Sequence, residues 1–492
     1  MPKILRQYSR KLHLSLAWLA AFSLLAFVLS GLTHILMVWT GPEAKRHKAP
    51  TIKLNASNIT AVQTVIKRHH LQDSKITKVV KTKDGLMLQV TEEIEQARRY
   101  FSLDNLQEYL GYDEQQAIWL ARYYTGNNSE IKQVEFITTF SNEYPWVNRL
   151  LPVYRVSFSG SDDLSAFIYT ETNTLASISN AYKESLQTVF QIFHTWSFLD
   201  AYPIVRIMLI SVLMFSLLFV LLTAIVMLVS IKRKTPQPIT KQLHRKLAVV
   251  VVIPCLAFVI SGIYHLYQNE LVDNLSGIHL SKAIPLDTID WQYLDTTKLS
   301  DTEKNISSLS IINYKEQAYL RASFLNDDKL PKSAHAHHQK SEKEQRFDGK
   351  PQQNSALYLP LTADPVKLND AIYSEYLARN FLSLDADVPL EANIIKRFGA
   401  DYDFRNKRLP VWQFIATDHH REMIFIDPIS GILVDRSQSL QQAERWSFSL
   451  LHKWGFFRAF ASREIRDGVM AVVLLMTVLL TVLGIGLKWQ RR

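Results

Sequence analysis

The chain has 492 residues, of which 47% are hydrophobic and 21% are charged, with a formal net charge of +10. The basic residues bracket four apolar runs instead of forming a stripe with interleaved aromatics, so we expect contact with a lipid bilayer and no binding of nucleic acid. A single cysteine, Cys255, excludes a disulfide framework and a cysteine-ligated iron–sulfur cluster built from this chain alone.

Along the chain, the apolar runs alternate with long polar stretches. Each apolar run is close to the roughly 20 residues that cross a bilayer. In chain order we expect an N-terminal tail and first transmembrane helix (1–40), a first outer domain (41–203), a second helix (204–231), a cytoplasmic loop (232–243), a third helix (244–267), a second outer domain (268–466) and a fourth helix with a cytoplasmic tail (467–492). Lysine and arginine at both termini and in the 232–243 loop predict that these parts lie on the cytoplasmic side.

Three matches indicate that the chain is an internal duplication. Residues 12–34 match 243–265 at an offset of 231, and residues 140–154 match 398–412 at an offset of 258. Residues 190–198 match 448–456 at the same offset of 258. We assign the difference of 27 residues to an insertion at about 326–354, a polar tract typical of a loop. The unit is helix, outer domain, helix, and the two copies should be related by a pseudo-two-fold axis along the membrane normal.

Short alternating segments near the end of each outer region predict antiparallel hairpins. Residues 153–158 and 166–170 alternate and are separated by a turn at 160–163, and residues 411–415 and 423–427 repeat the pattern. Helical stretches are expected near 57–70 and 367–381. The predicted fold class is a membrane α-helical protein, a four-helix transmembrane bundle with two small α+β outer domains.

Six histidines fall inside the repeated segments, and they are His13, His34, His194, His244, His265 and His452. His13 and His34 are 21 residues apart, about 31 Å along a helix, so they mark opposite edges of the membrane. His244 and His265 repeat this spacing. Pseudo-symmetry then pairs His13 with His244 at the inner edge, and His34 with His265 and His194 with His452 at the outer edge.

Paired imidazoles at two depths favour haem iron held by two axial histidines, because neutral imidazole is a good haem ligand and facing helices of a bundle can each supply one. The inner haem would use His13 and His244 and the outer one His194 and His452, with His34 and His265 as a third pair or as alternative ligands. Two or three b-type haems are therefore expected. Interfacial histidines and a zinc or copper site at the outer cluster are the alternatives that these histidines leave open. Arg206, Arg463 and Arg466, near the outer ends of the second and fourth helices, are candidates to pair with haem propionates, with interfacial anchoring as the alternative.

The motifs resemble those of the PepSY-associated transmembrane family, which includes iron-regulated membrane proteins and ferric-siderophore reductases. Leu12-His13 and Leu243-His244 are similar to the start of that family's first and third transmembrane helices. Phe193-His194 and Leu451-His452 resemble the motif that precedes its second and fourth transmembrane helices. Residues 169–173 and 426–431 resemble its hairpins, although the first copy lacks the aspartate and the glycine. The likeness extends over nearly the whole chain, so the outer domains are expected to be PepSY-like.

The resemblance implies a haem b reductase of the bacterial inner membrane that passes electrons to a periplasmic acceptor, with a ferric siderophore in iron uptake as the expected one. The electron donor, a quinol or a flavoprotein, must be a separate molecule, because the chain has no GxGxxG run. A non-enzymatic PepSY scaffold or sensor that binds a periplasmic partner is the alternative, and a metal transporter is a weaker one. Both leave the histidines without a redox role, so the assignment as an enzyme stays open here.

Overall fold

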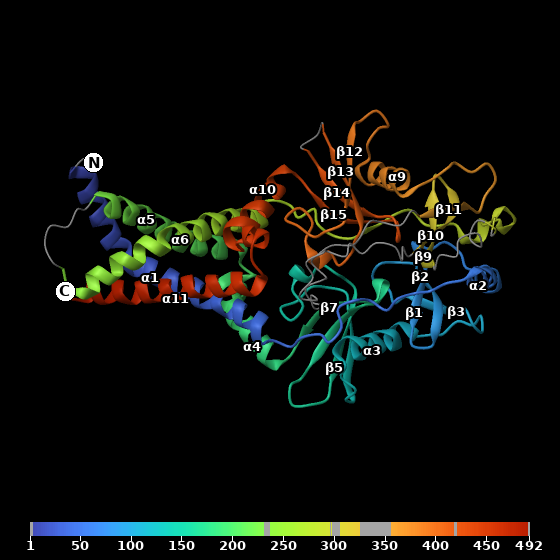
Figure 1. Ribbon diagram of the computed structural model, residues 1–492, viewed down its shortest axis with the longest axis horizontal. Coiled ribbons are helices and arrows are strands. Elements are labelled where there is room, and N and C mark those ends of the chain that lie inside the picture. Colours follow the sequence, from blue (N-terminus) through green and yellow to red (C-terminus); the bar gives the residue numbers. More distant parts are fainter. Residues whose placement is uncertain are drawn as a thin grey trace, which may run out of the picture. The chain divides into compact units, whose positions relative to one another are not determined.

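The computed structural model describes residues 3–230, 237–295, 297, 306–324, 356–417 and 421–490. Its contacts divide the chain into two compact units, which are drawn in Figure 1. Unit 1 comprises Met1–Gly41, Ala181–Asn274 and Leu440–Arg492, and unit 2 comprises Pro42–Asn180 and Leu275–Ser439. The insertion expected at about 326–354 lies outside the described residues.

Unit 1 is built around four long apolar helices. They are α1 (Lys3–Thr40), α5 (Pro203–Ser230), α6 (Ile239–Leu271) and α11 (Arg463–Trp489). In the described part of the chain, these four are long and apolar enough to cross a membrane. They confirm the expectation of a membrane protein with four spanning helices.

The four helices pack as a ring, in which α1 contacts α5 and α11, and α6 contacts the same two neighbours. Side chains such as Ala20, Leu217 and Val251 fill the centre. Small polar residues lie between the helices: Ser23 Oγ of α1 lies 3.2 Å from the carbonyl of Leu213 on α5. Such residues are typical of helix interfaces in membranes, because they allow close approach and supply hydrogen bonds where water is absent.

Short helices complete one end of unit 1, which we call the distal end because both chain termini lie at the other (Figure 1). The segment before α5 contains α4 (Ala181–Phe190), a π-helical turn η3 (Gln191–Thr195) and η4 (Ser197–Leu199). The segment before α11 contains α10 (Ser439–Ser447), a π-helical turn η8 (Phe448–His452) and η9 (Gly455–Ala459). The two segments therefore have the same order of elements.

Unit 2 contains three antiparallel sheets. The largest has the strand order β11-β10-β9-β1-β2-β3 and combines strands from both polar segments of the chain. Its strands are β1 (Ile76–Thr82), β2 (Gly85–Thr91), β3 (Arg99–Ser102), β9 (Ile306–Tyr314), β10 (Gln317–Phe324) and β11 (Leu357–Pro360). The junction is the pairing of β1 with β9, where Lys78 lies opposite Ser310. Both polar segments thus belong to one compact unit, with helix α2 (Ala56–Arg68) packed on this sheet.

The other two sheets share an order of four consecutive strands, and the second has a fifth strand, β8. One has the order β4-β5-β6-β7 and the other β12-β13-β14-β15-β8. The first consists of β4 (Ile131–Ile137), β5 (Val153–Phe158), β6 (Ser165–Tyr169) and β7 (Thr174–Ser179), and the second of β12 (Leu390–Ile395), β13 (Val411–Ala416), β14 (Met423–Asp427), β15 (Ile432–Ser437) and β8 (His279–Leu280). The 258-residue offset of the sequence relates β5, β6 and β7 to β13, β14 and β15. The hairpins expected near 153–170 and 411–427 are present.

One helix packs against each of these sheets. Helix α3 (Tyr112–Thr125) covers the β4–β7 sheet, and α9 (Asp370–Leu382) covers the second. The helices expected near 57–70 and 367–381 correspond to α2 and α9. Helix α3 was not expected from the sequence. It lies between Gly111 and Gly126, and both glycines have left-handed φ angles, 68° and 62°, which are suited to helix ends.

Candidate functional site

Two π-helical turns place one histidine each at the distal end of unit 1. His194 lies in η3 and His452 is the last residue of η8. Their ring centroids are 6.2 Å apart and the ring planes are nearly perpendicular, at 83°. The histidines paired from the sequence repeat at positions 194 and 452 therefore do lie side by side. Single π-helical turns are uncommon and are frequent at functional sites.

A left-handed tryptophan ends each of these turns. Trp196 and Trp454 have φ angles of 56° and 50°. This region is uncommon for large residues, so the surrounding structure must hold the chain there. The Trp196 indole donates to the carbonyl of Phe193 at 3.2 Å, and Trp454 stacks on Phe258 at 5.7 Å. These contacts fix the two turns, and with them the backbone that carries His194 and His452.

Both distal imidazoles are bound through Nδ1 to a serine of a long helix. His194 Nδ1 lies 3.0 Å from Ser30 Oγ on α1, and His452 Nδ1 lies 3.2 Å from Ser261 Oγ on α6. Burial lowers the pKa of His194 to about 4 and that of His452 well below its ordinary value. Both rings are therefore neutral at physiological pH, the state in which imidazole binds a metal.

Aromatic rings surround the histidine pair in a repeated arrangement. Phe190 stacks on His194 and Phe448 stacks on His452, both with centroids 4.6 Å apart. Phe27 meets His194 edge-on at 5.7 Å, and Phe258, 231 residues later, meets His452 at 5.5 Å. The pair thus has an apolar environment in which an uncharged ring is stable.

His34 and His265 contact the phenylalanines next to this pair. His34 lies 5.7 Å from the Phe190 ring, and His265 stacks on Phe448 at 4.1 Å. His265 is also hydrogen-bonded to Glu444, with 2.6 Å between Nδ1 and Oε1. The residue equivalent to Glu444 in the first half is Leu186, so the two positions differ chemically.

His13 and His244 lie toward the other end of the bundle, and each bonds the second long helix of its own half, α5 or α11. His13 Nδ1 lies 3.3 Å from the Val220 carbonyl of α5, and His244 Nδ1 lies 3.2 Å from the Leu480 carbonyl of α11. A carbonyl oxygen only accepts, so Nδ1 carries the hydrogen in both rings and Nε2 keeps its lone pair. Gly484 allows this close approach, because a Cβ there would lie 3.2 Å from His244 Cε1.

The two histidine levels are separated by equal lengths of helix. Ser30 lies 17 residues after His13, and Ser261 lies 17 residues after His244, about 25 Å along each helix. The histidines that the structure describes in unit 1 are the six in the sequence repeats. Arg206 forms ion pairs with Asp200 and Glu270.

His194 and His452 are the residues of the distal end that would hold a metal or haem iron, because both imidazoles are neutral and their ring centroids are 6.2 Å apart. Among the described residues, no three His, Cys, Asp or Glu side chains gather as a metal site.

Unit 2 contains a buried charge cluster that sequence reasoning missed. Glu171 forms ion pairs with Lys78 and Arg408 and accepts a hydrogen bond from Ser430 at 2.8 Å. Arg408 also binds Asp427 at 2.7 Å. The first-half hairpin has Tyr169 where the second has Asp427, and Glu171 supplies its carboxylate two residues later. The only available signal was that departure from the hairpin motif.

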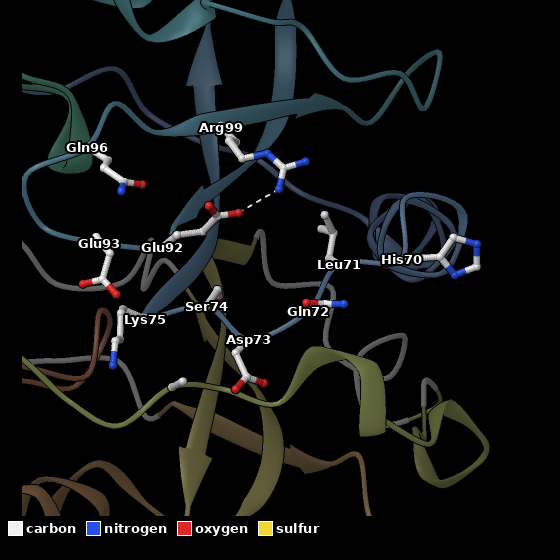
Figure 2. Close-up of a pocket in the computed structure, with 11 residues that line it drawn as sticks. His70, Leu71, Gln72, Asp73, Ser74, Lys75, Glu92, Glu93, Gln96 and Arg99 are labelled. Carbon is white, nitrogen blue, oxygen red and sulfur yellow. Dashed lines mark hydrogen bonds and ion pairs between the residues drawn. The ribbon is translucent and has the colours of Figure 1, made fainter.

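Figure 2 shows a polar cavity of about 580 Å³ in unit 2. Its lining includes Asp73, Lys75, Glu93 and the ion pair between Arg99 and Glu92. Groups of both charges line it, and none of the histidines predicted as ligands contributes. The cavity therefore does not define a ligand class.

Comparison with known proteins leaves the family open. No protein-family model matches the chain, and no curated protein matches it. Functional assignment therefore depends on the geometry of the histidines.

Proposed function

We propose that the protein is a haem b-containing transmembrane reductase of the PepSY-associated transmembrane type. The observation that carries the proposal is the 6.2 Å separation of His194 and His452, two neutral imidazoles at equivalent positions of a repeated sequence. Each is bonded through Nδ1 to a serine hydroxyl, as ligand histidines commonly are through the ring nitrogen that faces away from the metal.

The distal haem would be held by His194 and His452, and a second one by His13 and His244. Bound haem supplies one-electron redox chemistry. The chain's residues bind and orient: the serines and helix carbonyls hold Nδ1, and Phe27, Phe190, Phe258 and Phe448 keep water from the distal pair. His34 and His265 stay available as a third pair or as alternative ligands, although the bond between His265 and Glu444 favours a supporting role for His265.

The remaining features of the proposal follow from the sequence repeats and the helices. A gene duplication would explain why β5–β7 and β13–β15, the π-helical turns and the left-handed tryptophans recur. Basic residues at the terminal end favour cytoplasmic termini in a bacterial inner membrane, with PepSY-like segments in the periplasm.

Labelling in spheroplasts of a cysteine placed at the exposed Ser161 tests this orientation, and protection of that cysteine would contradict it. Electrons would pass from a quinol or flavoprotein to a periplasmic acceptor such as a ferric siderophore.

A reduced-minus-oxidised spectrum of the purified protein tests the haem assignment. We expect the sharp bands of a low-spin cytochrome b. His194→Ala and His452→Ala should each remove the distal centre, and His13→Ala and His244→Ala the other one. The control is His279→Ala, in an exposed position of unit 2, which should leave the spectrum unchanged.

A colourless, iron-free and correctly folded protein would contradict the haem proposal and favour a non-enzymatic scaffold or sensor that binds a periplasmic partner. Metal flux without redox activity would instead favour a transporter. Full haem content in the His194→Ala/His452→Ala double variant would show that these two residues are not the ligands.

A further inference from the structure

Ser30 and Ser261 are among the most enclosed polar side chains of unit 1, each with about 1% of its surface exposed. They occupy equivalent positions, 231 residues apart, on α1 and α6. Each lies against the Nδ1 atom of one distal histidine. Water is excluded at this depth, so the hydrogen bonds made by these hydroxyls are decided by the protein alone.

The hydrogen atom of each serine hydroxyl is already used. Ser30 Oγ lies 2.6 Å from the carbonyl of Ala26, and Ser261 Oγ lies 2.8 Å from the carbonyl of Ala257. Both distances are shorter than those to the histidines, 3.0 Å and 3.2 Å. A hydroxyl has one hydrogen to donate, and a carbonyl oxygen can only accept it. The serine oxygen therefore acts as acceptor toward the histidine.

The hydrogen between each serine and its histidine must then be on the imidazole. A neutral imidazole has one N–H, so hydrogen on Nδ1 leaves a lone pair on Nε2.

We propose that Ser30 and Ser261 are positioning residues that fix the distal histidines as Nδ1–H tautomers and present Nε2 as the ligand atom. The tautomer follows from the hydrogen bonds alone. Its role toward haem rests on the proposed function. Hydrogen bonding from Nδ1 makes an imidazole a more basic ligand and orients its ring, so the two serines would lower the midpoint potential of the distal centre.

The tautomer can be measured without haem. In the full-length, haem-depleted protein with ¹⁵N-labelled histidine, His194 and His452 should give the chemical shifts of Nδ1–H rings, assigned by loss of each signal in its alanine variant. Ser30→Ala should shift the His194 signal toward a mixture of tautomers, and Ser261→Ala should do so for His452. Ser30→Thr and Ser261→Thr keep the hydroxyl and should restore the wild-type shifts.

Ser23→Ala is the matched control, because Ser23 lies on α1, is fully buried and bonds the carbonyl of Leu19 at 2.9 Å. It should leave both histidine signals unchanged. If an alanine variant does not fold, Ser30→Cys and Ser261→Cys, whose thiols are weak acceptors, replace it with little change in volume.

In the haem-loaded protein, the alanine variants should weaken haem binding by about 10- to 100-fold and raise the midpoint potential of the distal centre, while the threonine variants should match the wild type. Wild-type Nε2–H rings, or alanine and cysteine variants that change neither tautomer nor potential, would overturn the inference about the serines. A haem-free protein that keeps Nδ1–H rings would sink only the haem proposal. The two failures are therefore distinguishable.

Discussion

Glu171 is the residue on which the buried charges of unit 2 converge. Burial alone would raise the pKa of its carboxyl, but Arg408 and Lys78 lower it far below its ordinary range. Burial also lowers the pKa of Lys78, which Glu171 partly offsets. The pair between Glu171 and Arg408 joins the two polar segments of the chain, since Glu171 precedes α5 while Arg408 follows α6.

We expect Glu171→Gln to destabilise unit 2 by about 3–5 kcal/mol, because it leaves buried cations without their carboxylate. Thermal or urea unfolding followed by tryptophan fluorescence measures the change. Asp163→Asn is the control, since Asp163 forms an exposed ion pair with Lys132 and should cost less than about 1 kcal/mol. Equal losses of unfolding free energy in the two variants would show that the buried cluster stabilises unit 2 no more than an exposed ion pair does.

At the residue scale, the sequence repeat predicted that His194 lies beside His452, and their ring centroids are 6.2 Å apart. It did not single out Ser30 and Ser261, although both lie within the matched segments 12–34 and 243–265. A serine in an apolar helix commonly bonds its own helix backbone. Only the position of the π-helical turns shows that these two also reach a histidine.

At the scale of elements, the approach of α5 to α6 depends on Gly262. A Cβ at this position would lie 2.9 Å from Met214 Cε of α5. The methionine end is flexible, so a methyl group can displace it, but a larger side chain must separate the helices. Glycine at such a contact is typical of packed membrane helices.

Gly262→Ala should therefore cost less than about 1.5 kcal/mol, while Gly262→Leu should cost about 1–3 kcal/mol or more. Helix melting by circular dichroism in detergent gives both values. Gly486→Ala serves as the control, because a Cβ there meets nothing within 4 Å. If the leucine variant melts like the wild type, the glycine is not needed for packing.

Some elements could be predicted from local sequence and others could not. The four apolar helices followed from length and hydropathy, and the hairpins of β5–β6 and β13–β14 followed from alternation. Helix α3 escaped detection although Gly111 and Gly126 mark its ends. Its 14 residues mix buried Ala117, Leu120 and Tyr124 with polar side chains, so its apolar pattern is weak.

At the scale of the whole molecule, unit 2 joins both polar segments through one sheet. The β1–β9 pairing and the Glu171 cluster both cross the boundary between the two segments. Loss of the β1–β9 pairing or of the Glu171 cluster should therefore destabilise both halves of unit 2 together.

Unit 2 should lose stability as pH falls below about 4.5, the ordinary pKa of a glutamate. The carboxyl of Glu171 has a lowered pKa in the folded state, so the unfolded state binds more protons in this range and acid favours unfolding. The stabilisation is complete above pH 4.5 and disappears as pH approaches the folded-state pKa. Midpoints of thermal unfolding between pH 7 and pH 3 measure it, and Glu171→Gln should show a smaller decrease. An equal decrease in both proteins would contradict the assignment.

The sequence by itself determined the four spanning helices, the hairpins and the six repeated histidines, because these depend on local hydropathy, alternation and self-similarity. Only the tertiary structure decided that His194 and His452 lie beside each other on π-helical turns, that Ser30 and Ser261 bond them, and that β1 pairs with β9. The physical reason is that alternation of apolar and polar residues predicts a strand but does not specify the strand with which it pairs. A buried ion pair between residues as distant in sequence as Glu171 and Arg408 likewise leaves no local pattern.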